Sequence, residues 1–357
     1  MKIVQIVNSI TAGGAERLVL DLHREYRRMG HQSYVAALSG SERVEGEDGF
    51  WCTGCKSPYA PPASGRLSSF FRCEPLASAD IAHVHLFPSL LRVPGALLRA
   101  GWRGRLFASE HSTSNRRRGT LWGNVADNFT YRRYEKIVCV SEAVREAVVT
   151  WKPVLQNKAV VIPNGARLDL FKSEGRTGFH DPPVILSVGR LAPAKNYRTA
   201  LKAVADLIDR TDHAFKWMIA GDGGMRTELE ELVSDLSLNG VVEFLGTCDD
   251  IPQLMRDSDI FFIPSLWEGF GIAAVEAMAS GLPVVASDVS GLREVVGSEA
   301  GLLVDPASVE DMSVALKKLI CDSDTALEMG SHGPEKASNY SLEACAVSHI
   351  NLFRDRQ

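Results

Sequence analysis

Two glutamates, Glu268 and Glu276, stand eight residues apart around a glycine-flanked turn in the second half of the sequence. The apolar pattern predicts a strand that ends near Pro264 and a helix that starts directly after the turn. The amides of Gly269–Ile272 would then lie at a helix N-terminus, available to a diphosphate. Carboxylates accept hydrogen bonds from sugar hydroxyls, so the two glutamates could hold two different sugars. The plain alternative is a capped helix with one exposed glutamate.

Two cations, Arg190 and Lys195, follow the predicted first strand of the same half, in Ser187-Val188-Gly189-Arg190-Leu191 and beyond it. Ligands of parallel sheets bind beyond the carboxyl ends of the strands, which is where both cations would lie. Arginine offers a bidentate fork to phosphate oxygens, and lysine offers a point charge. The pattern indicates a phosphate site, with solvated surface cations as the alternative.

Three further segments could offer backbone groups to a ligand. Gly13 and Gly14 follow the first predicted strand and open a helix, although the dinucleotide fingerprint G-x-G-x-x-G is absent there. Gly221 begins a turn between a strand and a helix, and Phe244–Leu245 ends an edge-like strand that could face a base. Each segment is equally compatible with ordinary turn chemistry.

His111 directly follows a predicted strand of the first half and precedes Arg116–Arg118. The histidine could meet a hydroxyl or a phosphate, and the arginines could hold an anion. A structural hydrogen bond and a solvated loop are the respective alternatives. The stretch 90–106 mixes leucines with arginines, as either an interfacial helix or a packed helix with a basic face would.

Short β-branched runs alternate with amphipathic stretches along the chain, which predicts βα units and parallel sheets. Segment 40–75, rich in glycine and proline, is predicted as a long irregular loop. The expected strands are 2–8, 33–38, 80–85, 105–109, 136–140 and 158–162, then 184–188, 216–220, 241–245, 260–263, 283–286 and 302–304. The expected helices are 14–29, 88–100, 121–134 and 142–150, then 195–210, 224–237, 249–256, 271–280, 291–296 and 308–330, with Pro334 separating a last helix that starts at Ser341.

The 357 residues therefore predict two doubly wound α/β domains, over 1–165 and 182–335, with the last helix (341–357) packing back on the first. Residues 1–160 are net basic and the remainder net acidic, which suggests an anionic partner for the first half unless domain charges merely scatter. No apolar run reaches membrane-spanning length, and no signal peptide is expected. Seven cysteines favour reduced thiols in the cytoplasm, and the single C-x-x-C at Cys52 and Cys55 is a weak zinc or redox signal.

Together these segments resemble family 4 of the retaining glycosyltransferases, which have the GT-B fold of two Rossmann-like domains facing across a cleft. The most specific part is the E-x7-E element from Glu268 to Glu276. S-V-G-R-L with its following lysine, I-P-N-G, G-D-G and the N-terminal G-G-A-E occur in the family's order. The sequence departs from the common I-P-N-G-V-D at Ala166 and Arg167, and no family motif matches segment 40–75.

The resemblance implies a first domain that binds the acceptor and a second that binds a nucleotide sugar. His111, Arg190, Lys195 and Glu268 would act at the transferred sugar and the diphosphate. Glu276 would bind the ribose hydroxyls. The remaining donor-binding positions would be Gly13, Gly14, Gly189, Gly221, Phe244, Leu245, Phe270, Gly271 and Ile272.

The expected reaction is retaining transfer of a hexose or N-acetylhexosamine from a nucleotide sugar to a glycan or polyprenyl-diphosphate acceptor in polysaccharide biosynthesis. The expected donor is UDP-linked, and a GDP-mannose-dependent mannosyltransferase is the alternative. No metal, cofactor or nucleic acid is implied. The protein would be cytoplasmic, with peripheral contact of the first domain to the anionic inner face of the membrane. A sugar-nucleotide epimerase, a glycan phosphorylase and a non-catalytic glycan-binding protein are the rivals. A dinucleotide oxidoreductase is disfavoured by the missing fingerprint.

Overall fold

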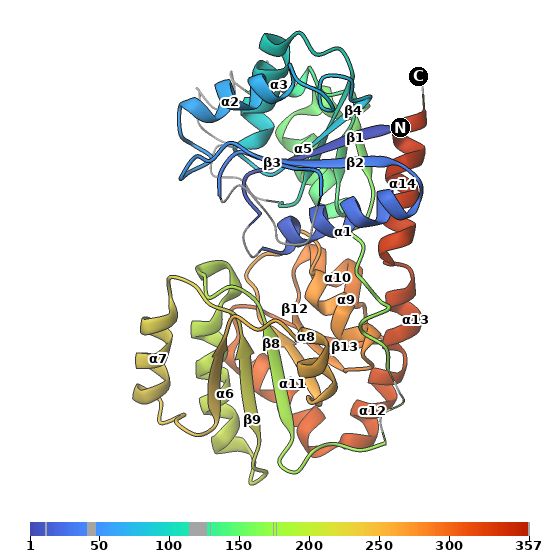
Figure 1. Ribbon diagram of the computed structural model, residues 1–357. Helices are drawn as coiled ribbons and strands as arrows, with labels where there is room; N and C mark the ends of the chain where they lie inside the picture. The colour runs from blue at the N-terminus through green and yellow to red at the C-terminus, as the bar shows by residue number, and fades with distance from the viewer. Residues whose placement is uncertain are drawn as a thin grey trace. The chain divides into compact units, whose positions relative to one another are not determined.

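The computed structural model describes residues 1–10, 13–40, 48–113, 127–128, 130–173, 175 and 177–355. Internal contacts divide the chain into two compact units (Figure 1). The first unit comprises residues 1–165 and 342–357, and the second comprises residues 166–341. Each unit is a parallel α/β sheet flanked by helices, which confirms the predicted fold class.

Seven parallel strands form the sheet of the first unit, in the order β3-β2-β1-β4-β5-β6-β7. The strands are β1 (Lys2–Val7), β2 (Gln32–Ala37), β3 (Phe50–Cys52), β4 (Ile81–His85), β5 (Arg105–Glu110), β6 (Ile137–Cys139) and β7 (Ala159–Val161). The described helices are α1 (Gly14–Arg28), α2 (Pro62–Phe70), α3 (Ser89–Ala100), α5 (Glu142–Trp151), the 3-10 turn η1 (Pro153–Leu155) and α14 (Leu342–Arg354). The strand order reverses between β1 and β4.

Helix α14, from the end of the chain, completes the first unit. It packs against α1, where Phe353 meets the ring of Tyr26 (Figure 1). At its C-terminus the guanidinium of Arg105 donates to the backbone carbonyls of Phe353 and Asp355, and it also pairs with Glu135. A cation at a helix C-terminus is favoured because the last carbonyls lack helical donors.

Six parallel strands form the sheet of the second unit, in the order β10-β9-β8-β11-β12-β13. The strands are β8 (Val184–Val188), β9 (Lys216–Ala220), β10 (Val242–Gly246), β11 (Ile260–Ile263), β12 (Val284–Ser287) and β13 (Gly301–Val304). The helices are η2 (Pro193–Lys195, a 3-10 turn), α6 (Tyr197–Arg210), α7 (Arg226–Asp235), α8 (Ile251–Arg256), α9 (Ile272–Ala279), α10 (Ser290–Val296), α11 (Val309–Cys321), α12 (Ser323–Ser331) and α13 (Gly333–Ser338). Here the order reverses between β8 and β11.

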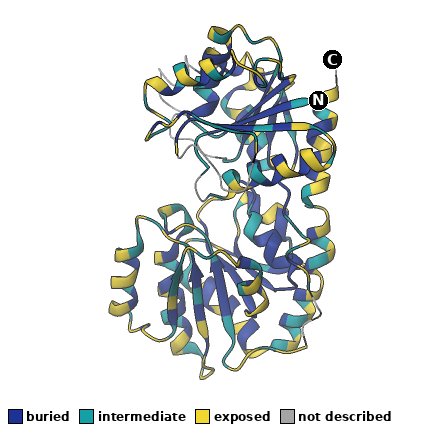
Figure 2. Cartoon of the chain, viewed as in Figure 1, coloured by how far each residue is buried: buried dark blue, intermediate teal, exposed yellow. Residues whose placement is uncertain are grey.

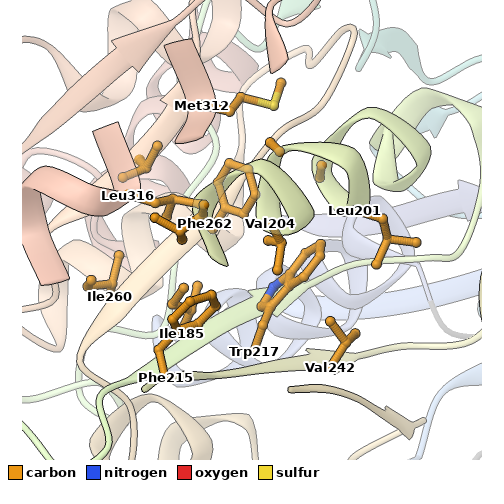
Figure 3. Close-up of a cluster of buried hydrophobic side chains, with 14 of the residues drawn as sticks. Ile185, Leu201, Val204, Phe215, Trp217, Val242, Ile260, Phe262, Met312 and Leu316 are labelled. Atoms are coloured by element: carbon orange, nitrogen blue, oxygen red, sulfur yellow. The ribbon is translucent and has the colours of Figure 1, made fainter. Parts of the chain in front are cut away.

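The central strands are buried on both faces, as expected of parallel sheets covered by helices (Figure 2). In the second unit, one face of the sheet packs against α6 and α11 through a continuous apolar cluster (Figure 3). Its largest member is the indole of Trp217, whose Nε1 donates to the hydroxyl of Ser187 at 3.0 Å. Burying each such apolar side chain contributes roughly 1.5–3 kcal/mol to the free energy of unfolding. This cluster therefore holds the strand ends in fixed positions.

The prediction of a long irregular loop over 40–75 is wrong. Strand β3 and helix α2 lie within this segment. Strand β3 is a three-residue edge strand that pairs with β2 alone, too short to show a clear alternation in sequence. Helix α2 begins at Pro62, a position where proline is compatible with a helix because the first amides need no helical acceptor.

Two helix predictions near the C-terminus also need correction. The single helix expected over 308–330 is divided into α11 and α12, because the carboxylate of Asp322 accepts from the Thr325 amide at 3.0 Å and caps a new helix. Pro334 lies in the first turn of α13 instead of between helices. Half of the helix expected over 121–134 falls outside the described residues.

Candidate functional site

The point of strand-order reversal in the second unit collects the polar residues singled out in the sequence. The segment after β8 carries Gly189, Arg190 and Lys195, and the segment after the neighbouring strand β11 carries Glu268. The amide of Leu266 donates to the carbonyl of Ala194 at 2.8 Å and ties the two segments together. Such reversal points are where open α/β sheets bind ligands.

Lys195 and Glu268 form an ion pair at this position. The Nζ of Lys195 donates to Oε1 of Glu268, and the hydroxyl of Ser265 donates to the same oxygen at 3.0 Å. The lysine side chain also lies against Gly189, where a Cβ atom would come within 3.1 Å of its Cε. Both partners are only partly shielded, with 24% and 17% of their side chains exposed, so a ligand can still reach them. Arg190 is exposed beside them.

Helix α9 starts at the same edge of the sheet. Its N-cap, Gly271, has φ +92°, a left-handed conformation that glycine adopts at low cost. The first helical hydrogen bonds are donated by Ala274 and Val275, so the amides from Gly271 to Ala273 precede the helical ladder. Phe270 is buried against the ring of Tyr340, which holds the turn in place. An anion in front of these amides would meet the positive end of the helix dipole.

Glu276 lies in the second turn of α9 and is 8% exposed. The helix around it is apolar and almost fully buried, from Ala274 to Ala279. Burying a charged carboxylate in apolar surroundings costs free energy unless hydrogen bonds or an ion pair compensate it. The position is compatible with the predicted role at the ribose, which stays a prediction.

Three adjacent strand ends of the second unit are joined by backbone hydrogen bonds. The amide of Gly189 donates to Ala220 at 2.9 Å, and the amide of Gly221 donates to Gly246 at 2.7 Å. Gly221 has φ +143°, and a Cβ atom there would stand 2.0 Å from the carbonyl oxygen of Gly189. The turns after β8, β9 and β10 therefore form one rim at the carboxyl edge of the sheet.

A β-bulge lies at the end of the edge strand β10. Phe244 pairs with Ile219 and Gly246 with Ala220, so Leu245 is the extra residue. The extra residue of a bulge is not paired in the regular ladder of hydrogen bonds between strands. Its backbone groups are therefore available to another donor or acceptor. Arg226 covers this end, with its guanidinium 5.8 Å from the Phe244 ring centroid and a 3.3 Å hydrogen bond to the Phe244 carbonyl. Sequence reasoning missed Arg226 because only the fold brings α7 beside β10.

The first unit has its own reversal point, between β1 and β4. Asn8, directly after β1, donates to the carbonyl of Phe87 at 2.7 Å and accepts from the amide and hydroxyl of Ser89. It thereby joins the end of β1 to the start of α3. Gly13 is the N-cap of α1, and a Cβ atom on Gly14 would meet nothing within 4 Å. Asn8 went unpredicted, although a polar residue that ends a buried strand is a usable signal.

His111 follows β5, as predicted, and lies in a cluster of imidazoles. Its Nε2 is 3.2 Å from Nδ1 of His85, the last residue of β4. His83 and His349 continue the cluster behind them. Burial lowers the pKa of His111 to about 4 and holds the pKa of His85 well below its usual range, so both rings are neutral near pH 7.

The other described positions that were singled out in the sequence have structural contacts of their own. Arg116–Arg118 lie outside the described residues. Helix α3 buries its apolar side and its Arg92 donates to the carbonyls of Tyr59 and Ala60, as a packed helix would. Arg167, at the departure from the family motif, pairs with Asp169 at 3.2 Å. The thiol of Cys52 donates to the carbonyl of Gly40 at 3.3 Å.

Across the described ranges, no three His, Cys, Asp or Glu side chains gather in a way that could hold a metal ion. None of the helices in the described part of the chain is both long and apolar enough to cross a bilayer.

The fold and the second unit's site define a two-domain α/β protein with a cation, a carboxylate and a helix N-terminus at one sheet edge. Residues 12–170 match the family profile described as glycosyltransferase family 4, and residues 171–336 match glycosyl transferases group 1. The chain is 32% identical over 296 residues to an uncharacterized glycosyltransferase of Methanocaldococcus jannaschii, covering 77% of this chain and 75% of that protein. The chain therefore belongs to glycosyltransferase family 4 and transfers a sugar from a nucleotide-sugar donor.

Other similarities agree with this assignment. The D-inositol 3-phosphate glycosyltransferase of Corynebacterium jeikeium is 30% identical over 324 residues, covering 82% of this chain and 76% of that one. HepE of Anabaena, solved in complex with UDP and glucose, superposes with a TM-score of 0.84 at 22% identity over 100% of both chains. Sucrose-phosphate synthase of Thermosynechococcus elongatus gives 0.81 at 20% identity, over 99% of this chain and 98% of that one. These structures show that the fold is GT-B.

Proposed function

We propose that this protein is a retaining transferase that moves a hexose or N-acetylhexosamine from a UDP-sugar to a glycan or polyprenyl-diphosphate acceptor. The observation that carries the proposal is the Lys195–Glu268 pair at the β8/β11 reversal point, beside the N-terminus of α9. A cation, a carboxylate and the amides of a helix N-terminus are the groups that a sugar diphosphate requires.

The diphosphate is assigned to Lys195, Arg190 and the first amides of α9. These groups supply positive charge where negative charge develops as the sugar–phosphate bond breaks. On Glu268, the hydrogen bonds from Lys195 and Ser265 both reach Oε1, which leaves Oε2 for a hydroxyl of the transferred sugar. Glu276 is assigned to the ribose hydroxyls.

The nucleobase is assigned to the backbone of Leu245, freed from the sheet by the bulge. Backbone donors and acceptors at a fixed spacing can read the edge of a pyrimidine. UDP is favoured over GDP because HepE, which shares the fold, was solved with UDP and with UDP-glucose. In the first unit, Gly13 and Gly14 are assigned to the donor's diphosphate and His111 to the transferred sugar and acceptor.

The chemistry proposed needs no nucleophile from the protein. The acceptor oxygen bonds to the anomeric carbon on the face from which the diphosphate departs, as the bond from that carbon to the phosphate oxygen breaks. The acceptor's proton passes to an oxygen of the leaving diphosphate. Positioning and charge stabilisation then account for catalysis, and the protein's cations and amides serve in place of a metal ion.

Thermal stabilisation tests the donor assignment directly. UDP, GDP, ADP and NAD are compared at matched concentrations, each with Mg²⁺ and with a chelator. A ligand at 100 times its Kd adds roughly 2.7 kcal/mol. We expect a shift with UDP that is independent of Mg²⁺. A shift with GDP alone would favour a GDP-mannose donor, and a shift with NAD alone would contradict the proposal.

Transfer assays on two lysine variants test the site. Lys195→Met should lower kcat/KM by roughly 10²–10³-fold, the usual loss on removing one charge-stabilising donor, while the fold persists. Lys202→Met is the matched control, because Lys202 is exposed on α6. Glu276→Ala should abolish transfer. Full turnover in Lys195→Met or Glu276→Ala would overturn the site assignment, and turnover that leaves the sugar on the nucleotide would indicate an epimerase.

Peripheral membrane contact by the first unit is the second part of the proposal. Leu98 is 61% exposed near the end of α3, beside the exposed Arg99 and Arg103. Arg72 reaches the same place, since its Nη2 donates to the carbonyl of Arg99 at 3.0 Å. An apolar side chain within a cluster of arginines suits an anionic lipid surface, and such a surface would carry a polyprenyl-linked acceptor.

Flotation with vesicles of anionic and of neutral lipid tests this contact. Binding to anionic vesicles should weaken as salt is raised, and Leu98→Asp should weaken it further. Val154→Asp is the control, since Val154 is equally exposed in the first unit but lies in η1. Salt-independent binding, or equal loss in both variants, would remove the membrane contact from the proposal.

A further inference from the structure

Arg226 is the first residue of α7, and its guanidinium lies at the end of the edge strand β10. Its Nη2 donates to the carbonyl of Phe244 at 3.3 Å, and its Cζ is 5.8 Å from the centroid of the Phe244 ring. A Cβ atom on Gly246 would stand 3.4 Å from its Nη1. The guanidinium therefore lies next to the residues on either side of Leu245, the extra residue of the bulge.

An ion pair within α7 sets the orientation of this guanidinium. The Nε of Arg226 donates to Oε1 of Glu230 at 2.7 Å. Residues four apart lie on the same face of a helix, so the pair forms without any change in the backbone. With Nε bonded to a carboxylate and Nη2 to the Phe244 carbonyl, the planar guanidinium is held by two of its three nitrogens.

The two N–H groups of Nη1 are available to a ligand. A guanidinium carries five N–H donors and no acceptor. Within the part of the chain that the structure describes, no protein acceptor bonds Nη1 of Arg226, and 33% of the side chain is exposed. Water serves these donors in the free protein. A ligand that displaces this water without offering an acceptor leaves a charged donor unpaired, which costs binding free energy.

The strand order relates Arg226 to the diphosphate site. Lys195 lies against Gly189, directly after β8, and β10 is the second strand along the sheet from β8. Neighbouring strands are about 4.8 Å apart, so the ends of β8 and β10 are separated by roughly 10 Å. This separation leaves room for a ribose between a diphosphate at β8 and a base at β10. A base placed there would meet the backbone of Leu245 and the Nη1 of Arg226 together.

We propose that Arg226 is a specificity-determining residue that selects a base with a carbonyl oxygen, and not an amino group, on the edge facing β10. Uracil has an oxygen acceptor at C4, where cytosine has an amino donor. Nη1 donates to the C4 oxygen of uracil, whereas with cytosine two donors face each other. A site built to hydrogen-bond one ligand rejects an analogue that leaves its polar groups unpaired. The inference rests on the proposed function for the position of the base.

The ratio of the Kd values for CDP and UDP isolates this edge of the base, because the two nucleotides share their size, ribose and diphosphate. Titration calorimetry measures both in the wild-type protein, in Arg226→Met, which has no donor, and in Arg226→Gln, whose amide can turn to offer either a donor or an acceptor. Inorganic pyrophosphate reports the diphosphate site alone. Arg198→Met is the matched control, since Arg198 on α6 also pairs with a glutamate of α7, Glu228.

The wild-type protein should bind UDP roughly 10–100-fold more tightly than CDP, the effect of one unpaired charged donor. In Arg226→Met and Arg226→Gln the two Kd values should agree within about 3-fold, and in Arg226→Met the change should come mainly from weaker UDP binding. Pyrophosphate binding should change by less than about 2-fold, and Arg198→Met should keep the wild-type ratio.

A wild-type ratio near 1 would overturn the inference, as would a wild-type ratio that persists in an Arg226 variant that still binds pyrophosphate. Transfer from a UDP-sugar by a protein with no preference between UDP and CDP would overturn the inference alone. A preference for UDP that Arg226→Met removes, in a protein that transfers no sugar, would refute the proposed function and leave the inference standing.

Discussion

Gly221→Ala should disrupt the rim of strand ends that supports the donor site. In the native structure this glycine has φ +143°, a conformation that residues with a Cβ rarely adopt. Its added Cβ would stand 2.0 Å from the Gly189 carbonyl oxygen and 2.8 Å from the carbonyl carbon, both of which are backbone atoms. The turns after β8 and β9 would have to separate by about 1.4 Å to restore an ordinary contact.

The magnitude follows from two costs. Forcing extra volume into a packed site costs about 1–3 kcal/mol, and a strained backbone conformation costs about another 1–3 kcal/mol. We expect a loss of about 4 kcal/mol in the free energy of unfolding of the second unit. At roughly 2–4 °C per kcal/mol, Tm should fall by about 8–16 °C. Because Gly189 supports Lys195, the KM for the donor should rise as well.

Calorimetry of the wild-type protein and of Gly221→Ala would measure the change in Tm, and urea denaturation would measure the change in the free energy of unfolding. Gly224→Ala is the matched control, since a Cβ there meets no atom within 4 Å, and its effect should stay within about 0.5 kcal/mol. A Gly221→Ala protein that melts within about 1 °C of the wild type would refute the reasoning, as would an equal loss in both variants.

Two further predictions concern stability. Asp259→Ala should lower the free energy of unfolding, measured by urea denaturation, by about 3 kcal/mol. This fully buried carboxylate accepts hydrogen bonds from the amides of Val184 at 2.7 Å and His180 at 3.1 Å, and its removal leaves both amides unpaired. A change below about 1 kcal/mol would contradict this prediction. Acid should destabilise the first unit, because burial lowers the pKa of His83 well below its usual range and that of His349 to about 3. Below about pH 6.5 the unfolded chain takes up protons that the folded unit excludes, so stability falls by up to about 1.4 kcal/mol per pH unit for each histidine until the folded-state pKa is reached. Urea midpoints at pH 7 and 5.5 measure the loss, which should be smaller in His349→Phe, and equal midpoints would count against buried neutral rings.

Much of the fold could be predicted because hydrophobic periodicity is a local property. Buried parallel strands such as Val184–Val188 and Ile260–Ile263 are short apolar runs between turn residues, and they appear where the pattern placed them. The failures have physical causes as well. Strand β3 is too short for a period to show, and the break at Asp322 depends on a cap that looks like any polar residue within a helix.

The candidate site was partly visible for the same reason. Strand ends were predictable, so residues that follow them, such as Arg190, Glu268 and His111, could be identified as facing the carboxyl edge of a sheet. Residues whose relevance depends on a neighbour in space were not. Arg226 matters only because α7 lies beside β10, and His85 only because β4 pairs with β5.

The kinds of groups available, and the strand ends at which they occur, can be read from the sequence, because side-chain chemistry and local periodicity need no partner. Which of those strand ends are neighbours is visible only in the folded protein. Lys195 and Glu268 are 73 residues apart in sequence. They form an ion pair because β8 has β11 as a neighbour in the sheet, as well as β9. His85 and His111, 26 residues apart, share a hydrogen bond because their strands are also neighbours. Strand order is set by the burial of whole helix and sheet faces over long loops, a property of the assembled core that no short stretch of sequence contains.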